Sequence, residues 1–581
     1  MTQIGDRYRS AGVGGALLAL GLLTAGCGPP SEAAIADLLA QASPTPQRGG
    51  TLEIGTIYVT ISALSWDPAD WNWKLNHDAG GIYEQLFAAD LAQAISRGGA
   101  YPFRAEAWLP TDAIRGELAE SWEWEDPLTL VVRLRRGVLF PAKPGVMEQR
   151  DLDAQDVLFT WERQAASPKM IRGYFDHVES VEARDSHTVV FRFREFNAEW
   201  PYRFGYGFYS AIVPREIGAV DASDWRHLNG TGPFRLTGFV PGNAQTYERN
   251  SLYWDHERVH GIDHQLPYVD RIVYRVIKDE ATQHTALRTG KIDILEIMSW
   301  LAVDWLKETT PELRWKRYLG GTGQFLALRV DQEPFDDLRV RRALNLAVDQ
   351  QEIVDLYYGG HAELLGHPMH PEFVGYYQPL DEMPESVREL FGYDPEAAKR
   401  LLAEAGYPNG FRFTAQVNAS DFDHAELMPL VAGYLERVGV EMVIEPLEYA
   451  SFLSRMTTKT HGPGYLMKSG HTNPTTSLRK NFTTGQLWNP SGWSDPGFDT
   501  RMDEALRTRD EEERQRILRE LTVEVLDQAP YVWLPTPYNH VAWWPWVRNY
   551  DGELRAGAVR PWPIYARIWI DHDMKRRMGF E

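Results

Sequence analysis

The chain has 581 residues, a formal net charge of −21 and an apolar fraction of 43%. Nucleic acids and anionic lipid surfaces attract basic patches, so this charge argues against either as the main partner. Cys27 is the one cysteine, which excludes an internal disulfide and a cysteine-rich zinc site.

The first residues are typical of an export signal. Arg7 and Arg9 form a short basic start, and an apolar run from Ala11 to Leu23 follows. The run covers about 13 residues, whereas a membrane-spanning helix needs roughly 20. We therefore predict a signal peptide over residues 1–26 and not a permanent membrane anchor.

The cysteine lies where such a signal would be removed. Thr24, Ala25 and Gly26 are small residues immediately before Cys27, and the arrangement resembles a bacterial lipobox. Lipidation of Cys27 would attach the mature chain to a membrane surface, and stable attachment needs more than one acyl chain. Segment 27–48 then serves as a lipid-anchored tether, because it is rich in Pro and Ser. Plain secretion is the alternative.

Alternating patterns predict strands in the first third of the mature chain. The segment that starts at Thr51 is β-rich, and residues 129–134 alternate between two faces. Residues 188–193 repeat this pattern after a turn at Asp185-Ser186.

Capping signals predict helices in the second half of the chain. Asp394 is a natural N-cap before a proline, and Gly406 fits the position after the last turn. An apolar period of helical type covers 336–358, and another covers 511–529. Strands and helices alternate without a fixed repeat, which indicates a mixed α/β protein of several lobes.

No residue pattern predicts catalysis or a bound cofactor. The Gly-rich stretch 320–323 lacks the Gly-Lys-Ser/Thr order of a phosphate loop. His256, His260 and His264 have the spacing of metal ligands on a helix, but Gly261 favours a loop with solvated histidines. Close carboxylate pairs are inevitable among 81 acidic residues, so they identify no hydrolase. We predict no cofactor, no metal and no enzyme activity.

Tryptophan is abundant, with 21 residues, and two groups lie among turn residues without periodicity. The groups contain Trp66, Trp71 and Trp73 in one segment, and Trp488, Asn489 and Trp493 in the other. Rings with a polar handle suit both cores and ligand grooves. We predict that these two groups line a groove; burial in a core is the alternative.

Several longer segments follow one another in an order typical of one protein family. "RGGTLEIG" begins the series, and "GELAESWEWEDPLTLVVRLRRGVLFP" runs into "LDAQDVLFTWERQA". "GTGPFRLTGF", "FDDLRVRRALNLAVDQQEIVDLYYGGHA" and "YDPEAAKRLLAEAGYPNGF" come later. The chain thereby resembles family 5 of the extracellular solute-binding proteins, the oligopeptide, dipeptide and nickel group that serves ABC importers.

The resemblance implies a large two-lobed α/β fold of the periplasmic-binding-protein type. It has mixed sheets, three domains and a hinge made of two strands that cross between the lobes. The implied division is lobe I at 49–89, 204–319 and 530–581, an inserted small domain at 90–203, and lobe II at 320–529. Ligand contacts from both lobes would stabilise the closed state.

The resemblance also points to one segment of lobe II. Peptide binders of the family carry a Trp and, three residues later, an Asp that pairs with the α-amine of the peptide. Aligned on Asn473-Pro474, this chain has Met467 and Gly470 at those two positions, and His471 follows. The amine-binding carboxylate is therefore missing from its usual place.

This missing carboxylate leaves the chemistry of the solute open. Asp421 or Glu445 would be able to replace it; otherwise the solute is a blocked peptide, an oligosaccharide stacked on tryptophans, or another compound. A peptide-type solute is the prediction, with an oligosaccharide or other non-peptide solute as the alternative.

The expected partners follow from the resemblance. We expect an exported, monomeric chain that delivers a small solute to an ABC permease with a separate ATPase. It would bind the membrane through its lipid and would bind no nucleic acid. A secreted hydrolase and a structural envelope lipoprotein are the alternatives from other functional classes.

Overall fold

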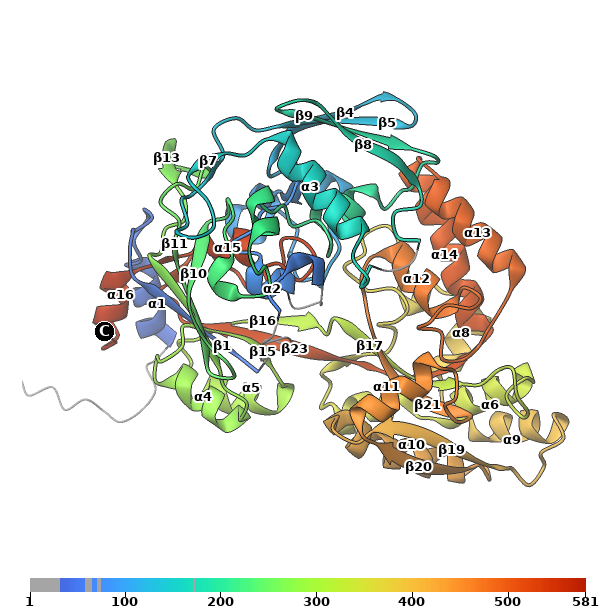
Figure 1. Cartoon of the computed structure of the whole chain (residues 1–581). Coiled ribbons are helices and arrows are strands. Elements are labelled where there is room, and N and C mark those ends of the chain that lie inside the picture. Colours follow the sequence, from blue (N-terminus) through green and yellow to red (C-terminus); the bar gives the residue numbers. More distant parts are fainter. Residues whose placement is uncertain (1–31, 58–64, 71–74, 171–172, 581) are drawn as a thin grey trace, which may run out of the picture.

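The computed structural model describes residues 32–57, 65–70, 75–170 and 173–580 (Figure 1). The predicted signal peptide and Cys27 lie outside these ranges. The fold has several mixed sheets with helices packed around them, so the predicted α/β class is confirmed.

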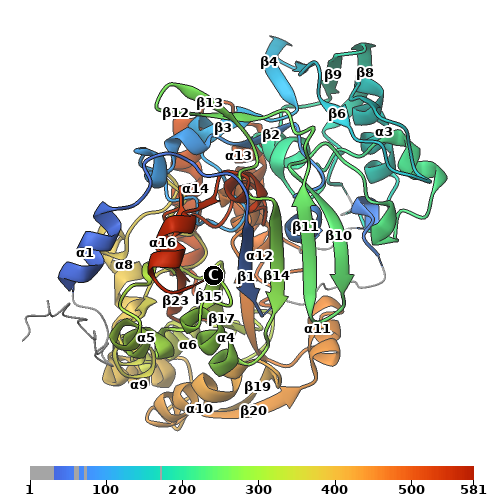
Figure 2. The same ribbon diagram turned by 90° about the vertical axis from the view of Figure 1, so that its left-hand side faces the viewer.

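The largest sheet has eight strands, in the order β10-β11-β14-β1-β15-β23-β16, with β18 paired to β23. Figure 2 shows β1, β14, β11 and β10 side by side. β1 runs parallel to both of its neighbours, and its buried Ile54 lies opposite Tyr274 and Ile294. The strands are β1 (Thr51–Thr56), β10 (Phe234–Val240), β11 (Ala244–Arg249), β14 (Arg271–Val276), β15 (Ile294–Met298), β16 (Arg314–Leu319), β18 (Ala362–Glu363) and β23 (Thr536–Trp543).

A second sheet has five strands in the order β20-β19-β21-β17-β22. β17 is antiparallel to β21, with Phe325 opposite Met467 and Thr322 opposite Gly470. A separate apolar core lies against this sheet and includes Leu326 and Leu344. The strands are β17 (Thr322–Leu328), β19 (Arg412–Asn418), β20 (Glu441–Leu447), β21 (Gly464–Gly470) and β22 (Tyr531–Trp533).

A third, antiparallel sheet lies at the top of Figure 1, in the order β4-β5-β9-β8, with α3 beneath it. Its elements are β4 (Ala119–Asp126), β5 (Thr129–Leu134), α3 (Ala154–Ala165), β8 (Val178–Asp185) and β9 (Thr188–Phe193). The two-stranded sheets are β2 (Phe87–Ala89) with β3 (Ile114–Gly116), β6 (Leu139–Phe140) with β7 (Arg150–Asp151), β12 (His256–Val259) with β13 (Ile262–Gln265), and β24 (Val547–Arg548) with β25 (Trp569–Ile570).

The first two sheets are joined by short steps along the chain. β16 ends at Leu319 and β17 begins at Thr322, so Gly320 and Gly321 connect one sheet to the other. β22 and β23 are connected in the same way, by the two residues between Trp533 and Thr536. Figure 1 shows β16 and β23 running across the molecule toward β17.

The remaining helices pack around these sheets. Their bounds are α1 (Glu32–Ala40), α2 (Leu75–Ala79), α4 (Glu280–Arg288), α5 (Val303–Thr309), α6 (Leu338–Ala347), α7 (Gln350–Glu352), α8 (Glu385–Arg388), α9 (Pro395–Glu404), α10 (Phe422–Glu436), α11 (Tyr449–Thr457), α12 (Pro474–Phe482), α13 (Pro496–Arg507), α14 (Glu511–Asp527), α15 (Trp562–Tyr565) and α16 (His572–Arg577). None of the helices in the described ranges has the length and apolar character that crossing a bilayer requires.

The helix predictions are confirmed in one case and corrected in another. Asp394 caps α9 by accepting a hydrogen bond from the backbone N–H of Ala397 at 2.8 Å. The single helix predicted over 336–358 is wrong, because α6 ends at Ala347. The side chain of Asp349 then accepts from the N–H of Glu352 and starts a new helix, which breaks the apolar period.

The spaced histidines lie on a hairpin and not on a helix. His256 belongs to β12 and His264 to β13, and the turn between the strands has positive φ at His260 and Gly261. The two strands therefore separate side chains that a helix would align. In the described part of the chain, no group of three or more His, Cys, Asp or Glu side chains is arranged to hold a metal ion.

Candidate binding cavity

A cavity of about 530 Å³ lies between the eight-stranded and the five-stranded sheet. The first sheet and its loops contribute Arg104, Glu106, Ile297, Tyr318, Asn539, Leu554, Arg555 and Val559. The second contributes Gly321, Thr322, Asn418, Asp421, Tyr449, Phe452, Leu453, Met467, Lys468, Ser469, Gly470, Lys480 and Trp488. Its volume fits a small solute, since ligand sites commonly measure about 300–1,000 Å³.

Three of the predicted site residues line this cavity. Met467 and Gly470 lie on β21, and Gly470 is the last residue of that strand. Trp488 follows α12 and keeps 39% of its surface exposed, so its ring is accessible from the cavity. The end of a central strand and one aromatic side chain thus form part of the same wall.

The two other predicted tryptophans that the structure describes, Trp66 and Trp493, are buried in a core. Trp66 is 1% exposed, and its ring meets Phe239 edge to face at 5.0 Å between centroids. Trp493 is 6% exposed and meets Phe498 in the same manner at 5.1 Å. Neither lines the cavity, and Trp71 and Trp73 lie outside the described residues.

Asn489 organises the turn between Trp488 and Trp493. Its Nδ2 donates to the carbonyl of Trp493 at 2.8 Å, and its Oδ1 accepts from the Oγ of Ser491 at 2.9 Å. It is buried and does not line the cavity. The non-periodic aromatic pattern therefore belongs to a turn in which Trp493 packs into the core and Trp488 lies in the cavity wall.

His471 is buried directly behind the wall at Gly470. Its backbone N–H donates to the carbonyl of Gly321 at 2.9 Å. Its ring lies 5.4 Å from that of His367 and 5.2 Å from that of His370. Burial lowers the pKa of His367 to about 3 and that of His370 to about 4, and it holds the pKa of His471 well below its usual value. The three rings are therefore neutral at physiological pH.

Glu106 occupies the space beside Gly470. A Cβ placed on Gly470 would lie 3.5 Å from Glu106 Oε2, and one on Gly321 would lie 2.7 Å from the same atom. The backbone of Glu106 is held by a hydrogen bond from the N–H of Val559 to its carbonyl, at 2.8 Å. The absence of a side chain at Gly321 therefore leaves room for the carboxylate of Glu106 to approach the second sheet.

Two cations share this corner with Glu106. Lys480 donates through Nζ to the carbonyl of Gly470, and Arg555 donates through Nη1 to the carbonyl of Leu554 at 2.7 Å. Burial raises the pKa of Glu106, and the charges of Arg555 and Lys480 oppose that rise. Burial lowers the pKa of Lys480 to about 8, against the attraction of Glu106.

Sequence reasoning missed Glu106, Lys480 and Arg555. Glu106 lies in a segment without helix or strand, and Arg555 lies in another, so neither had a periodic pattern to mark it. Lys480 faces the cavity from α12, which Asn473 caps by accepting from the N–H of Thr476. The three side chains come from separate parts of the chain, and only folding brings them together.

The two acids considered as replacements for a carboxylate at 470 are both paired. Asp421 lines the cavity and accepts from Lys468 Nζ at 2.9 Å. Glu445 is 3.4 Å from Arg455 and accepts from Gln416 at 2.8 Å, and it does not line the cavity. Glu106 is the acid that lies nearest to the position of Gly470.

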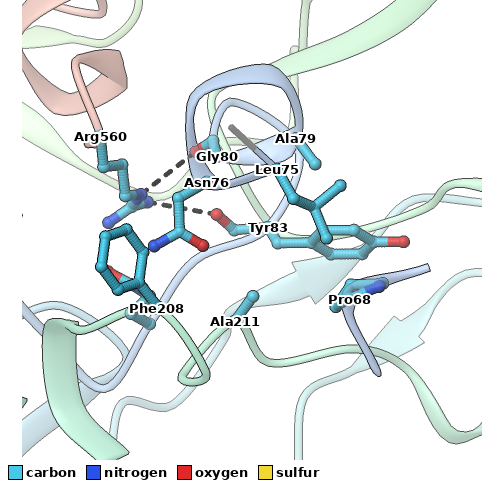
Figure 3. A pocket seen from close by; sticks show the side chains of 10 residues that line it. Pro68, Leu75, Asn76, Ala79, Gly80, Tyr83, Phe208, Ala211 and Arg560 are labelled. Carbon is cyan, nitrogen blue, oxygen red and sulfur yellow. Dashed lines mark hydrogen bonds between the residues drawn. The ribbon is translucent and has the colours of Figure 1, made fainter. Parts of the chain in front are cut away.

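The other hollows of the described residues are less suited to a solute. The pocket drawn in Figure 3 is small, with a volume of about 10 Å³. Arg560 is part of its lining and donates hydrogen bonds to the carbonyls of Gly80 and Tyr83. This volume holds about one water. Arg560 also forms a buried ion pair with Glu117 at 2.7 Å, which indicates a structural role.

A hollow of about 810 Å³ lies beside β1 on the outer side of the large sheet. Two of the charged side chains in its lining are paired across ion pairs: Arg275 with Glu53 at 2.7 Å, and Lys575 with Asp293 at 3.0 Å. A further hollow of about 530 Å³ lies near the chain end, between Arg288 and Phe580 among others. Both are lined without any residue of the five-stranded sheet.

Comparison with known proteins decides the family. The model of the bacterial extracellular solute-binding proteins, family 5, matches residues 113–489, which is more than half of the chain. The chain belongs to this family. Members of the family are extracellular binding proteins, so this chain is a solute-binding protein and not an enzyme.

Individual relatives of this family 5 protein cover most of its length. It is 28% identical to heme-binding protein A of Haemophilus influenzae, over 73% of this chain and 79% of that one. It is 26% identical to di/tripeptide-binding protein 1 of Pseudomonas aeruginosa, over 82% and 87% of the two chains. The periplasmic binding protein DppA of Helicobacter pylori, solved with the peptide STSA, has the same fold, with a TM-score of 0.70 at 23% identity over 90% of this chain and 99% of that one.

Proposed function

We propose that the chain is the extracytoplasmic solute-binding lipoprotein of an ABC importer, and that it captures a peptide-type solute in the cavity between its two main sheets. It would then deliver the solute to a permease that works with a separate ATPase. The observation that carries this proposal is the cavity of about 530 Å³ lined by both sheets, which two-residue steps connect. The names of the di/tripeptide-binding and peptide-bound relatives support the solute class.

The steps at Gly320-Gly321 and between Trp533 and Thr536 are suited to act as the hinge. A few residues at strand ends can absorb a large rotation, and solute contacts from both sides stabilise only the closed arrangement. The proposed division has lobe I at 49–89, 204–319 and 534–581, the inserted domain at 90–203 and lobe II at 320–533, which moves the last boundary from the expected 529/530. β22 pairs with β17, so the last crossing into lobe I falls after Trp533 in this arrangement.

A non-peptide solute is the second candidate. Trp488 exposes a ring in the cavity wall, and a stacked sugar or another flat compound would use such a ring. Gly470 stands where peptide binders of the family carry an acid, and the relative from Haemophilus influenzae is named for heme.

Small-angle scattering tests solute-driven closure. The solute that co-purifies with the protein is identified by native mass spectrometry, removed by partial unfolding and added back. We expect the radius of gyration to fall on addition, because both sides then contact one solute. An unchanged radius at saturating solute, or turnover of the solute, would contradict the proposal.

A variant outside the cavity sharpens this test. Thr476 on α12 donates through Oγ1 to Glu199 Oε1 at 2.6 Å, across the junction between the inserted segment and the second sheet. Thr476→Val removes this contact without changing the cavity lining. We therefore expect the variant to need a higher solute concentration to reach the same radius of gyration. Thr500→Val is the matched control, since Thr500 donates only to Pro496 within its own helix.

A further inference from the structure

The charges that face the cavity are unlike those of the whole chain. Four cationic and two acidic side chains line it, whereas the chain carries a net charge of −21. Lys468 and Asp421 cancel each other at 2.9 Å. The imbalance therefore comes from Arg104, Lys480 and Arg555 against Glu106 alone.

The hydrogen bonds of these cations go to carbonyl groups. Lys480 donates to Gly470, Arg555 to Leu554, and Arg104 to Asp551 and Gly552. Within the described residues, no carboxylate forms an ion pair with Lys480 or Arg555. Neutral carbonyls satisfy these donors without neutralising their charge, so the counter-charge comes from more distant carboxylates, Glu106 for Lys480 and Glu296 with Glu106 for Arg555.

At this corner of the cavity, Glu106 is one acid beside the two cations Lys480 and Arg555. It faces Lys480 and Arg555 together, and burial opposes its own ionisation. Glu296 attracts Arg555 from behind the wall and, with Glu106, offsets the effect of burial, so Arg555 keeps its charge. Among the side chains that line this corner, two cations thus stand beside one acid, and an incoming anion would meet Lys480 and Arg555 together.

A solute amine would meet unfavourable neighbours here. The ammonium of Lys480 already holds the carbonyl of Gly470 and lies near the carboxylate of Glu106, which are the acceptors that an amine would need. A second cation would have to displace Lys480 and approach Arg555. The lining of the cavity also includes the apolar or aromatic side chains of Phe452, Leu453 and Trp488.

We propose that the cavity binds a carboxylate of its solute between Lys480 and Arg555, and that the solute has no free amine at this corner. The carboxylate would accept charge-assisted hydrogen bonds from both cations, and its apolar body would extend toward Trp488. This inference rests on the proposed function, because it assigns the solute class of the same cavity.

Three dipeptide probes that differ only at their ends test the charge preference. They are N-acetyl-Ala-Phe, its C-terminal amide, and Ala-Phe-amide with a free amine, each titrated into the solute-free full chain by calorimetry. We expect N-acetyl-Ala-Phe to bind at least tenfold more tightly than either amide, because it alone presents a carboxylate without an amine. Equal or tighter binding of Ala-Phe-amide would overturn the inference, and so would a co-purified solute without an acidic group.

Variants assign the preference to the two cations. Lys480→Met and Arg555→Gln should each weaken N-acetyl-Ala-Phe at least tenfold and leave its amide little changed, while Lys480→Arg should retain the preference. Lys399→Met is the control, because it removes one positive charge from the exposed face of α9. Equal losses for acid and amide would overturn the assignment.

The two proposals fail in different ways. If no small solute changes the radius of gyration, solute-driven closure is wrong. If a solute closes the protein but its affinity is insensitive to Lys480→Met and Arg555→Gln, closure stands and the carboxylate site is wrong. Thermal unfolding of each variant identifies any that fail to fold, and either cation variant alone suffices for the test.

Discussion

At the scale of single residues, Glu106 and Lys480 pack closely around Gly470 in the cavity wall. Glu106, from a segment without helix or strand, lies beside Gly321 and Gly470, and Lys480 donates to the carbonyl of Gly470. The φ angle of Gly470 is not positive, so the backbone conformation at position 470 does not require a glycine. Gly470 is therefore not a turn residue that needs a left-handed conformation.

Substitution of Gly470 separates charge from shape. A carboxylate introduced by Gly470→Asp would lie close to Glu106 and to the carboxylate of an anionic solute, so we expect binding to weaken by more than tenfold, about 1.4 kcal/mol. Gly470→Ala should have a much smaller effect, because its Cβ would meet its nearest atom at an ordinary 3.5 Å. Calorimetry with the co-purified solute measures both. Equal losses for Ala and Asp would contradict the electrostatic explanation, and tighter binding by Asp would indicate a solute amine.

The charge of Lys480 predicts a pH dependence of binding. Burial lowers its pKa from 10.5 to about 8, so the free protein loses this proton as the pH rises from 7 to 9. We expect the affinity for N-acetyl-Ala-Phe to fall about tenfold over that interval, since the bound form needs the ammonium. Lys480→Arg should remove the dependence, and calorimetry at several pH values measures it. A flat profile in the unmodified chain would contradict this role of Lys480.

The neighbours of Lys480 can be separated from Lys480 itself in this measurement of affinity against pH. Arg555 stays charged, and the pKa of His367, about 3, and that of His471 lie far below the interval. Glu106 is the remaining neighbour, and Glu106→Gln identifies its contribution. Between pH 8 and 10.5 Lys480 carries its proton in the unfolded chain but not in the folded one. The contribution of this group to the free energy of unfolding therefore rises with pH over that interval. Weaker binding at pH 9 is therefore not a sign of unfolding caused by Lys480.

At the scale of elements, the turn after α12 divides two tryptophans between two roles. Trp488 faces the cavity and Trp493 packs against Phe482 and Phe498. Asn489 holds the turn by its bonds to Ser491 and Trp493, which sets the direction of both rings. One short segment thus supplies both a core anchor and a ring in the cavity wall.

Alanine substitutions distinguish these two roles. Trp493→Ala should lower the free energy of unfolding by about 3–5 kcal/mol, because it leaves a large void in a core. Trp488→Ala should change stability little, since 39% of the side chain is already exposed, but it should weaken the solute. Denaturant unfolding and calorimetry measure the two effects. A large loss of stability from Trp488→Ala, or none from Trp493→Ala, would contradict the assignment.

At the scale of the whole molecule, the start of the described chain is attached to its end. After α1, the N–H of Ser43 donates to Asp571 Oδ2 at 2.8 Å, and Arg577 donates to the carbonyl of Gln41. Figure 2 shows α1 and α16 on the same side of the molecule. These contacts hold residues 41 and 43, which belong to the predicted tether 27–48, against the end of the chain.

Removal of the thiol tests the anchor. Cys27→Ser should move the exported protein from the membrane fraction into the soluble fraction, because it removes the attachment point of the acyl chains. Fractionation and intact mass measure the location and the lipid. A variant that remains with membranes and carries no acyl mass would show that the anchor lies elsewhere.

The sequence by itself determined the class of the fold, the family and several local elements. The Asp394 cap, the strands at 129–134 and 188–193 and the family segments are local patterns, and short-range hydrogen bonds and side-chain alternation produce them. The break after α6 was also local, but the continuing apolar period concealed the cap at Asp349.

Only the tertiary structure decided which residues form the cavity. Met467, Gly470 and Trp488 were predicted and lie in its wall, whereas Trp66, Asn489 and Trp493 are buried elsewhere. Burial of an aromatic ring depends on the elements that pack around it, and the sequence near the ring does not contain them. Glu106, Lys480 and Arg555 come from distant segments, so their shared charge exists only after the two sheets meet.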